Sequence, residues 1–175
     1  MGLHKIFCRS ARRTFLYSTL WLLIVAFISS ACSGPAVYRT STGVRLVGRI
    51  DDSSYARLAE LLTPGDLLIL DSDGGYVAAA GRMAVLVLRL HADTHVDDRC
   101  ASACALVFAA GHHRTTGPEA RIGVHQSTGP AEIDVVFGNA LRALGTPTAV
   151  VEAMERTPAR YIYWISESQL RAWIN

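Results

Sequence analysis

Four large aliphatic residues at positions 67–70 run straight into a turn, Asp71-Ser72-Asp73-Gly74-Gly75, which is followed by a strongly apolar segment at 77–90. An unbroken aliphatic run is typical of a strand buried on both faces, as in a parallel sheet. Two glycines at the end of such a strand allow main-chain N–H groups to face a ligand with no side chain in the way. Because the segment after the turn predicts a helix, this part of the chain predicts a strand–turn–helix unit of an α/β protein.

Similar units are predicted along the rest of the chain. Three further segments have the alternation or the aliphatic content of strands: 44–50, 93–96 and 121–125. Helices are predicted between and after the strands, at about 51–62, 77–90, 100–110, 133–144 and 148–155, with Ser166 as the N-cap of an apolar tail. Half of the 175 residues are apolar and 18% are charged, which is enough for one dense core. The sequence therefore predicts one domain with a parallel sheet flanked by helices.

The first 31 residues have the composition of a targeting segment. Residues 1–14 are basic, 15–28 are almost entirely apolar, and small residues follow up to Cys32. This order predicts an export signal ending at Ala31, of the general or the twin-arginine type. Lipidation of Cys32, or retention of residues 1–31 as a membrane-anchor helix, is an open alternative. In each case we expect a periplasmic protein, free or anchored to the inner membrane, with a tether at 32–43 and a domain at 44–175.

The charge balance predicts no nucleic-acid partner. The chain has 17 Lys+Arg, of which four lie in the first 31 residues, and it has 15 Asp+Glu. Subtracting those four leaves 13 basic residues against 15 acidic ones, so the exported part carries −2 and predicts no basic binding surface. Lys5 is the only lysine, which excludes a lysine base in the folded part.

Cys100 and Cys104 are the cysteines of the predicted domain, and export would allow them to oxidise. On a helix, residues four apart have α-carbons roughly 6 Å from each other, which is within disulfide range. Two buried free thiols are the alternative. No metal site is expected, because two cysteines need two further ligands for zinc. Strand alternation also separates the polar residues of the segment 91–98.

Three candidate functional groups follow three predicted strands. Gly75 lies in the turn after the first, Ser102 lies among small residues at a helix start, and His125 ends the third strand. Because the carboxyl ends of parallel strands meet at one edge of a sheet, we expect these groups to lie close together. A serine, a histidine and free main-chain amides are the parts of a nucleophile, a general base and an oxyanion hole.

Three motifs together resemble the ClpP-type serine protease subunits of the crotonase-like superfamily, and especially their exported bacterial relatives. They are Leu-Ile-Leu-Asp-Ser-Asp-Gly-Gly-Tyr-Val at 68–77, Cys-Ala-Ser-Ala-Cys at 100–104 and Ile-Gly-Val-His-Gln at 122–126, in the family's order. The resemblance spans about residues 44–130. It implies a ClpP/crotonase-like fold with Ser102 as nucleophile and His125 as general base, and with the amides of Gly75 and Ala103 as the oxyanion hole. It also implies a peptide or protein substrate and no cofactor, and we expect a homo-oligomer.

Two positions depart from the family pattern. Asp73 replaces a proline, and its carboxylate would oppose an oxyanion unless it points away. Where the family has the third triad residue, this chain has no acid between Glu155 and Glu167. Asp134 is the candidate substitute; otherwise the site is a Ser–His dyad. Two hypotheses follow: an exported serine hydrolase that acts as a peptidase, or a catalytically inactive ClpP-like binding or scaffold protein of the cell envelope.

Overall fold

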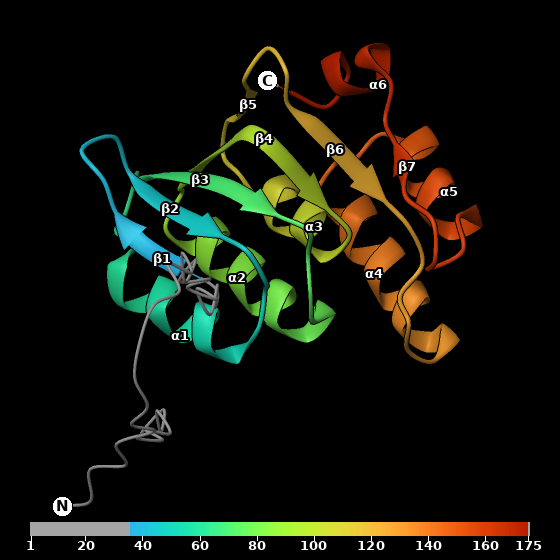
Figure 1. The fold of residues 1–175 in the computed structure, drawn as a ribbon, viewed down its shortest axis with the longest axis horizontal. Coiled ribbons are helices and arrows are strands. Elements are labelled where there is room, and N and C mark those ends of the chain that lie inside the picture. The colour runs from blue at the N-terminus through green and yellow to red at the C-terminus, as the bar shows by residue number, and fades with distance from the viewer. Residues whose placement is uncertain (1–35, 175) are drawn as a thin grey trace, which may run out of the picture. The chain divides into compact units, whose positions relative to one another are not determined.

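The fold is built on one sheet, seen in the computed structural model, which describes residues 36–174 (Figure 1). The seven strands of the described part are β1 (Ala36–Arg39), β2 (Val44–Val47), β3 (Leu67–Ser72), β4 (Asp93–Ala101), β5 (Arg114–Thr116), β6 (Arg121–Val124) and β7 (Tyr163–Trp164). Their order across the sheet is β1-β2-β3-β4-β6-β7, and β5 also pairs with β4. All predicted signal, anchor and lipidation sites, including Cys32, lie outside the described residues.

The centre of the sheet is parallel, as predicted from the sequence. The pairs β2–β3, β3–β4, β4–β5 and β4–β6 are parallel, whereas the two edge strands pair antiparallel, β1 with β2 and β7 with β6. The expected tether at 32–43 was wrong for Ala36–Arg39, which forms β1 and pairs with Val44–Val47 of β2. Four residues are too few for a clear alternation of apolar and polar side chains. The segment forms a strand because antiparallel pairing with β2 gives its main-chain groups hydrogen-bond partners.

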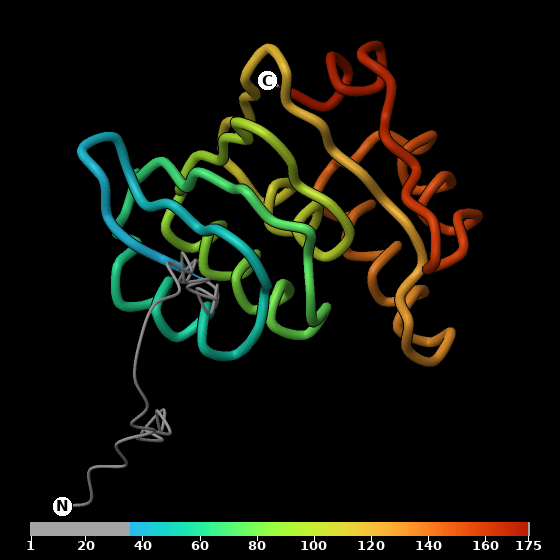
Figure 2. The backbone as a smooth tube through the Cα atoms, in the orientation of Figure 1, coloured from blue at the N-terminus to red at the C-terminus, as the bar shows by residue number. Residues whose placement is uncertain are grey.

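The described residues form six helices: α1 (Asp52–Leu61), α2 (Val77–Arg89), α3 (Ala103–Ala109), α4 (Ala131–Ala143), α5 (Thr148–Arg156) and α6 (Glu167–Arg171). In Figure 1, α1, α2 and α3 lie on the same side of the sheet. The tube in Figure 2 shows the chain leaving β3 and turning back into α2 under the sheet. No helix within residues 36–174 is long and apolar enough to cross a membrane.

Helix α3 forms the centre of the core. All seven of its residues are buried, and the Phe108 ring packs edge-on against Trp173 with ring centroids 5.2 Å apart. Helix α2 buries one face, through residues such as Met83 and Val87, and exposes Val85 and Leu88 on the other. The apolar residues of α2 therefore contribute to the core on one face of the helix only, and those on the other face are exposed to solvent.

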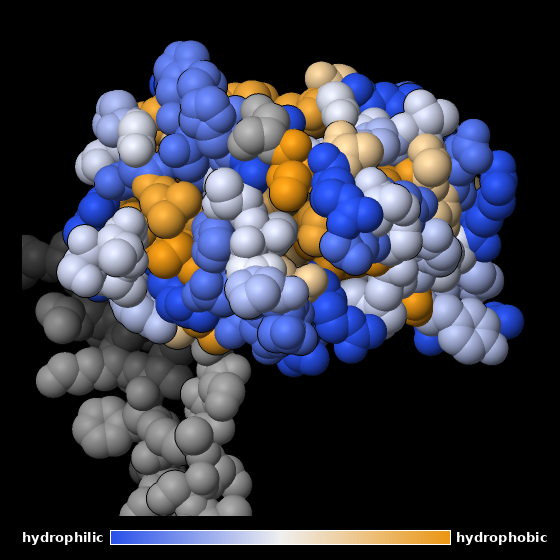
Figure 3. Space-filling model, turned by 90° about the horizontal axis from the view of Figure 1, so that it is seen from above, coloured by the Kyte–Doolittle hydropathy of each residue, from blue (hydrophilic) through white to orange (hydrophobic). Residues whose placement is uncertain are grey.

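The face of the sheet opposite α1–α3 is partly polar. Arg45 of β2 forms an ion pair with Asp97 of β4 at 2.7 Å, and the His95 ring lies 3.0 Å from the same carboxylate. The face of the molecule drawn in Figure 3 accordingly mixes small apolar patches with charged side chains. Strand alternation explains this pattern, because residues one apart point to opposite faces.

Candidate functional site

Ser102 lies in the turn between β4 and α3 and has an unusual backbone conformation. Its φ is 56° and its ψ is −127°, in a region that residues with a side chain rarely adopt. Although it is the N-cap of α3, its side chain makes no capping hydrogen bond. The backbone strain costs about 1–3 kcal/mol and is typical of active-site residues. This sharp strand-to-helix turn presents the hydroxyl as nucleophile elbows do.

The double glycine packs directly against this turn. A Cβ added to Gly74 would lie 2.6 Å from the carbonyl oxygen of Ala101 and 2.8 Å from the Cβ of Ser102, and the φ of Gly74 is +95°. At Gly75, a Cβ would lie 2.1 Å from the carbonyl oxygen of Ile50. Both glycines are therefore required for close approach of the chain: Gly74 to the turn that carries Ser102, and Gly75 to the segment at Ile50.

Two main-chain amides are available beside Ser102. Gly74 and Tyr76 are engaged, since Gly74 N donates to the Ser72 hydroxyl at 3.0 Å and Tyr76 N donates to the Ile50 carbonyl at 2.8 Å. Within residues 36–174, the N–H groups of Gly75 and Ala103 have no hydrogen-bond acceptor. These are the two amides that the sequence resemblance assigns to an oxyanion hole.

Asp73 is held by an arginine at the protein surface. Its carboxylate lies 3.0 Å from the Arg99 guanidinium, and the two side chains are 63% and 51% exposed. The ion pair partly compensates the negative charge that Asp73 would otherwise bring to the glycine turn. The sequence showed the carboxylate but could not show its partner, which comes from β4.

His125 follows β6 and lines the same cleft as Ser102. Its Nδ1 lies 2.6 Å from the carbonyl oxygen of Gln126. Because a carbonyl can only accept a hydrogen bond, Nδ1 carries the proton, and Nε2 of the neutral ring is left as the acceptor that a general base needs. No hydrogen bond joins Ser102 to His125 in the part of the chain that the structure describes.

The structure does not bring Asp134 onto the histidine ring. Its Oδ1 instead accepts a hydrogen bond of 2.6 Å from the main-chain N–H of Ser127. Among the described residues the Gln126 carbonyl is the group that orients His125, and the sequence gave no signal for a main-chain acceptor. A carbonyl fixes the ring and its tautomer, but it supplies no full negative charge to stabilise an imidazolium.

A disulfide links Cys100 to Cys104 on the two sides of Ser102. The expectation of a helix from Cys100 was wrong, because β4 continues to Ala101 and α3 begins at Ala103. The bond therefore joins the end of a strand to the first turn of a helix, with α-carbons 5.3 Å apart and both residues fully buried. It closes a five-residue loop centred on Ser102.

The cleft in front of Ser102 has a volume of about 1030 Å³. Its floor and walls are formed by the glycine turn, the start of α2, Leu106 of α3, the loop after His125, and α4. Apolar side chains face it from α2 and α4, namely Val77, Ile133, Val136 and Phe137. The α4 wall was not assigned to a site from the sequence, although its apolar residues recur at helical spacing.

The sheet with a parallel centre and its helices form an α/β fold, which comparison with solved structures shows to be ClpP-like. Among solved structures, the chain is similar to ClpP1 from Listeria monocytogenes, with a TM-score of 0.59 and 15% sequence identity over 74% of this chain and 85% of that chain. At this identity the likeness shows the fold alone. No protein-family model matches the sequence, and no curated protein matches it.

Proposed function

We propose that this protein is an exported serine hydrolase that cleaves peptides or proteins. Ser102 attacks the carbonyl carbon and His125 accepts its proton through Nε2. The amides of Gly75 and Ala103 hold the oxyanion. His125 then gives this proton to the leaving amine as the C–N bond breaks, which leaves the acyl group on Ser102. In the second half of the reaction, His125 takes a proton from water, the hydroxide attacks the acyl carbon, and the proton returns to the Ser102 oxygen as the acid is released. No cofactor takes part in this scheme.

The observation that carries the proposal is the backbone of Ser102. A turn with relaxed backbone angles would close the core equally well. The positive φ of Ser102 and the close packing of Gly74 against it therefore indicate a role other than packing. The strain places a hydroxyl free of capping contacts beside two free amides, which is what acyl transfer requires.

The cleft supports a peptide with apolar side chains as the substrate. Its volume of about 1030 Å³ lies at the upper end of the range of about 300–1000 Å³ that small-molecule pockets occupy. The wall formed by Val77, Ile133 and Phe137 would bury apolar side chains on either side of the scissile bond. Because the cleft is open, an extended chain can enter it without a lid.

Export and self-association are parts of the same proposal. A buried disulfide in the described domain is in keeping with an oxidising compartment such as the periplasm. The N-terminal segment would direct the chain there and, if retained or lipidated at Cys32, would hold it at the membrane. Exposed apolar residues on α2 and α4, including Val85 and Val135, offer contact surface for a homo-oligomer.

A second candidate function is a catalytically inactive binding protein that retains the cleft. Two observations favour it: His125 has no carboxylate partner among the described residues, and its ring is not hydrogen-bonded to Ser102. In serine proteases, loss of the orienting acid lowers turnover by about 10⁴ without abolishing catalysis. The two candidates therefore differ in whether Ser102 reacts at all.

Labelling of the purified full chain with a fluorophosphonate probe tests the proposal. We expect one covalent adduct per chain, none in Ser102→Ala, and labelling slowed by about 100-fold or more in His125→Ala. Ser127→Ala is the matched control, because Ser127 also lines the cleft but lies outside the strained turn. Equal labelling of the Ser102→Ala variant, or no labelling of the folded wild type, would favour the binding protein.

A further inference from the structure

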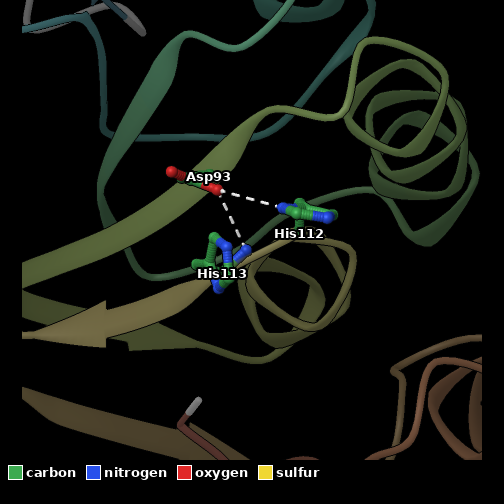
Figure 4. A group of neighbouring side chains, drawn as sticks. All are labelled: Asp93, His112 and His113. Atoms are coloured by element: carbon green, nitrogen blue, oxygen red, sulfur yellow. Dashed lines mark hydrogen bonds and ion pairs between the residues drawn. The ribbon is translucent and has the colours of Figure 1, made fainter.

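A cluster of metal-ligating side chains lies at the other end of β4, far from Ser102. Asp93 is the first residue of β4, and His112 and His113 lie in the loop between α3 and β5 (Figure 4). One ligand atom from each of the three residues lies within 4.8 Å of the other two. At about 3.3 Å per residue, β4 separates this cluster from Ser102 by about 30 Å, so it is not part of the hydrolase site.

The main chain holds the two histidines beside Asp93. The His112 N–H donates to the Ala92 carbonyl at 2.9 Å, and the Thr94 N–H donates to the His113 carbonyl at 2.9 Å. A Cβ at Gly111 would lie 2.1 Å from the Thr94 hydroxyl oxygen, so this glycine is needed for the loop to approach β4 so closely. The position of the cluster is thus fixed by backbone hydrogen bonds.

The three side chains are accessible to an ion from solvent. Asp93 is half-buried, and both histidines are exposed. The recorded contacts of the Asp93 carboxylate, with the His113 N–H at 3.0 Å and with His112 Nδ1 at 3.8 Å, both use Oδ1 (Figure 4). Its second oxygen faces no described donor and can bind an ion. The His91 ring lies edge-on to His112 with centroids 5.9 Å apart, which adds a further imidazole within reach.

We propose that Asp93, His112 and His113 bind a divalent transition-metal ion of the zinc class. Two imidazoles and one carboxylate are a ligand set that zinc accepts at distances of about 2.0–2.2 Å, with donor atoms then about 3.4 Å apart. Rotation of the two exposed rings brings the atoms from 4.8 Å or less to that separation. Magnesium and calcium prefer oxygen ligands and are disfavoured here. A fourth position is left for water or His91.

Such an ion would fasten the start of β4 to the loop before β5. Because binding to the folded state alone adds stability, zinc should raise the melting temperature of the protein. This proposal does not depend on hydrolase activity, since its readouts are affinity and stability.

Calorimetric titration of the metal-stripped full chain with ZnCl₂ tests the site. We expect a dissociation constant in the micromolar range, weakened by about 100-fold or more in His112→Ala/His113→Ala and by about 10-fold or more in Asp93→Asn. Zinc at about 100 times the dissociation constant should raise the melting temperature by about 5–10 °C in the wild type. Magnesium chloride should change neither quantity.

His95→Ala is the matched control, because His95 also lies on β4 and contacts Asp97 and Thr115 rather than this cluster. It should bind zinc like the wild type. Cys8 and Cys32 can also bind zinc. Because the wild type and all variants are compared as full chains, each contains these two thiols, and differences in zinc affinity come from the substituted residues. Co²⁺ can replace zinc as a spectroscopic probe. We expect an absorption band of nitrogen- and oxygen-bound cobalt in the wild type, and its loss in the double variant assigns the site.

Unchanged zinc affinity in the double variant, or a wild-type dissociation constant above about 1 mM, would overturn the proposal. If the double variant does not fold, Asp93→Asn gives the same test, because the exchange keeps the shape of the side chain and removes its charge.

Discussion

The two ends of β4 carry the two candidate sites, which are held in place by different forces. At the carboxyl end, Ser102 depends on the shape of the backbone: a strained φ, a glycine in contact with the turn, and a disulfide across it. At the amino end, the residues around Asp93 depend on main-chain hydrogen bonds and charge. The first arrangement should be sensitive to the addition of one methyl group, and the second to the removal of one charge.

Asp66, next to the amino end of β4, shows how strongly charge acts there. Its carboxylate accepts hydrogen bonds from Arg39 at 2.8 Å and from the hydroxyl and N–H of Thr63, both at 2.7 Å. The Arg39 guanidinium above all lowers the pKa of Asp66 from 3.8 to about 2. The Asp66 carbonyl in turn accepts from the N–H of Asp93, so the pair ties β1 to the start of β4.

Gly74→Ala should have the largest effect of the changes that test this comparison. The new methyl group would collide with the Ala101 carbonyl and the Ser102 side chain, and it would sit on a backbone with φ of +95°. If Ser102 is the nucleophile, a displacement of its hydroxyl by about 1 Å costs about 100-fold in rate. We therefore expect fluorophosphonate labelling to slow by about 100-fold or more.

Gly65→Ala is the control at the amino end. Its φ of +77° gives similar backbone strain, but a Cβ there meets nothing within 4 Å. We expect a loss of about 1 kcal/mol in unfolding free energy and normal labelling. Equal labelling rates in the two alanine variants would show that contact with the Ser102 turn is not what Gly74 provides.

Removing the disulfide should have the second largest effect. For a loop as short as Cys100–Cys104, the chain-entropy relation gives a loss of about 2 kcal/mol in Cys100→Ala/Cys104→Ala. Because the bond also holds the ends of the strained turn, we expect labelling of Ser102 to slow by about 10-fold. Denaturant unfolding and labelling kinetics measure the two effects, and labelling at the wild-type rate would show that the turn holds its shape without the bond.

Asp66→Asn should have the smallest effect, and it should be confined to stability. The folded-state pKa of Asp66 is about 2, below its ordinary value of 3.8, so its charge stabilises the fold above about pH 4. That contribution is lost as the pH falls through about 2. We expect the variant to lose about 1–2 kcal/mol at pH 7 and the difference from wild type to close between pH 4 and 2.

Labelling of Asp66→Asn should be unchanged, which separates a loss of stability from a change in the Ser102 turn. Asp52→Asn is the control for charge removal, because Asp52 pairs with Arg82 at the surface and is 81% exposed. Urea unfolding at several pH values gives both curves. A pH-independent difference for Asp66→Asn would contradict the role given to its charge.

The main elements could be predicted because their sequence signals are local. The aliphatic run of β3, the glycine turn and the apolar face of α2 each follow from a few neighbouring residues, and so does the N-cap of α6 at Ser166. The sequence also indicated Gly75, Ser102 and His125 as candidate groups, and the structure has all three lining one cleft.

The missed features depend on contacts between distant segments. Strands β1, β5 and β7 have two to four residues each, too few for a periodic pattern, and pairing with β2, β4 and β6 stabilises them. The polar residues Asp97 and Asp98 concealed the continuation of β4 to Ala101. Asp93 and His112 are brought together by the register of β4 and β5, which no spacing in the sequence reveals.

The antiparallel strands at the two borders of the sheet have a consequence for aggregation. Within the described residues, β1 is four residues long and ends in the charged Arg39, and β7 is two residues long. So short a border leaves few main-chain groups to template the strand of another molecule, and a charge at its end opposes stacking. The edges of the described sheet are thus poor templates for amyloid-like growth, which leaves side chains on the helices as the surface for self-assembly.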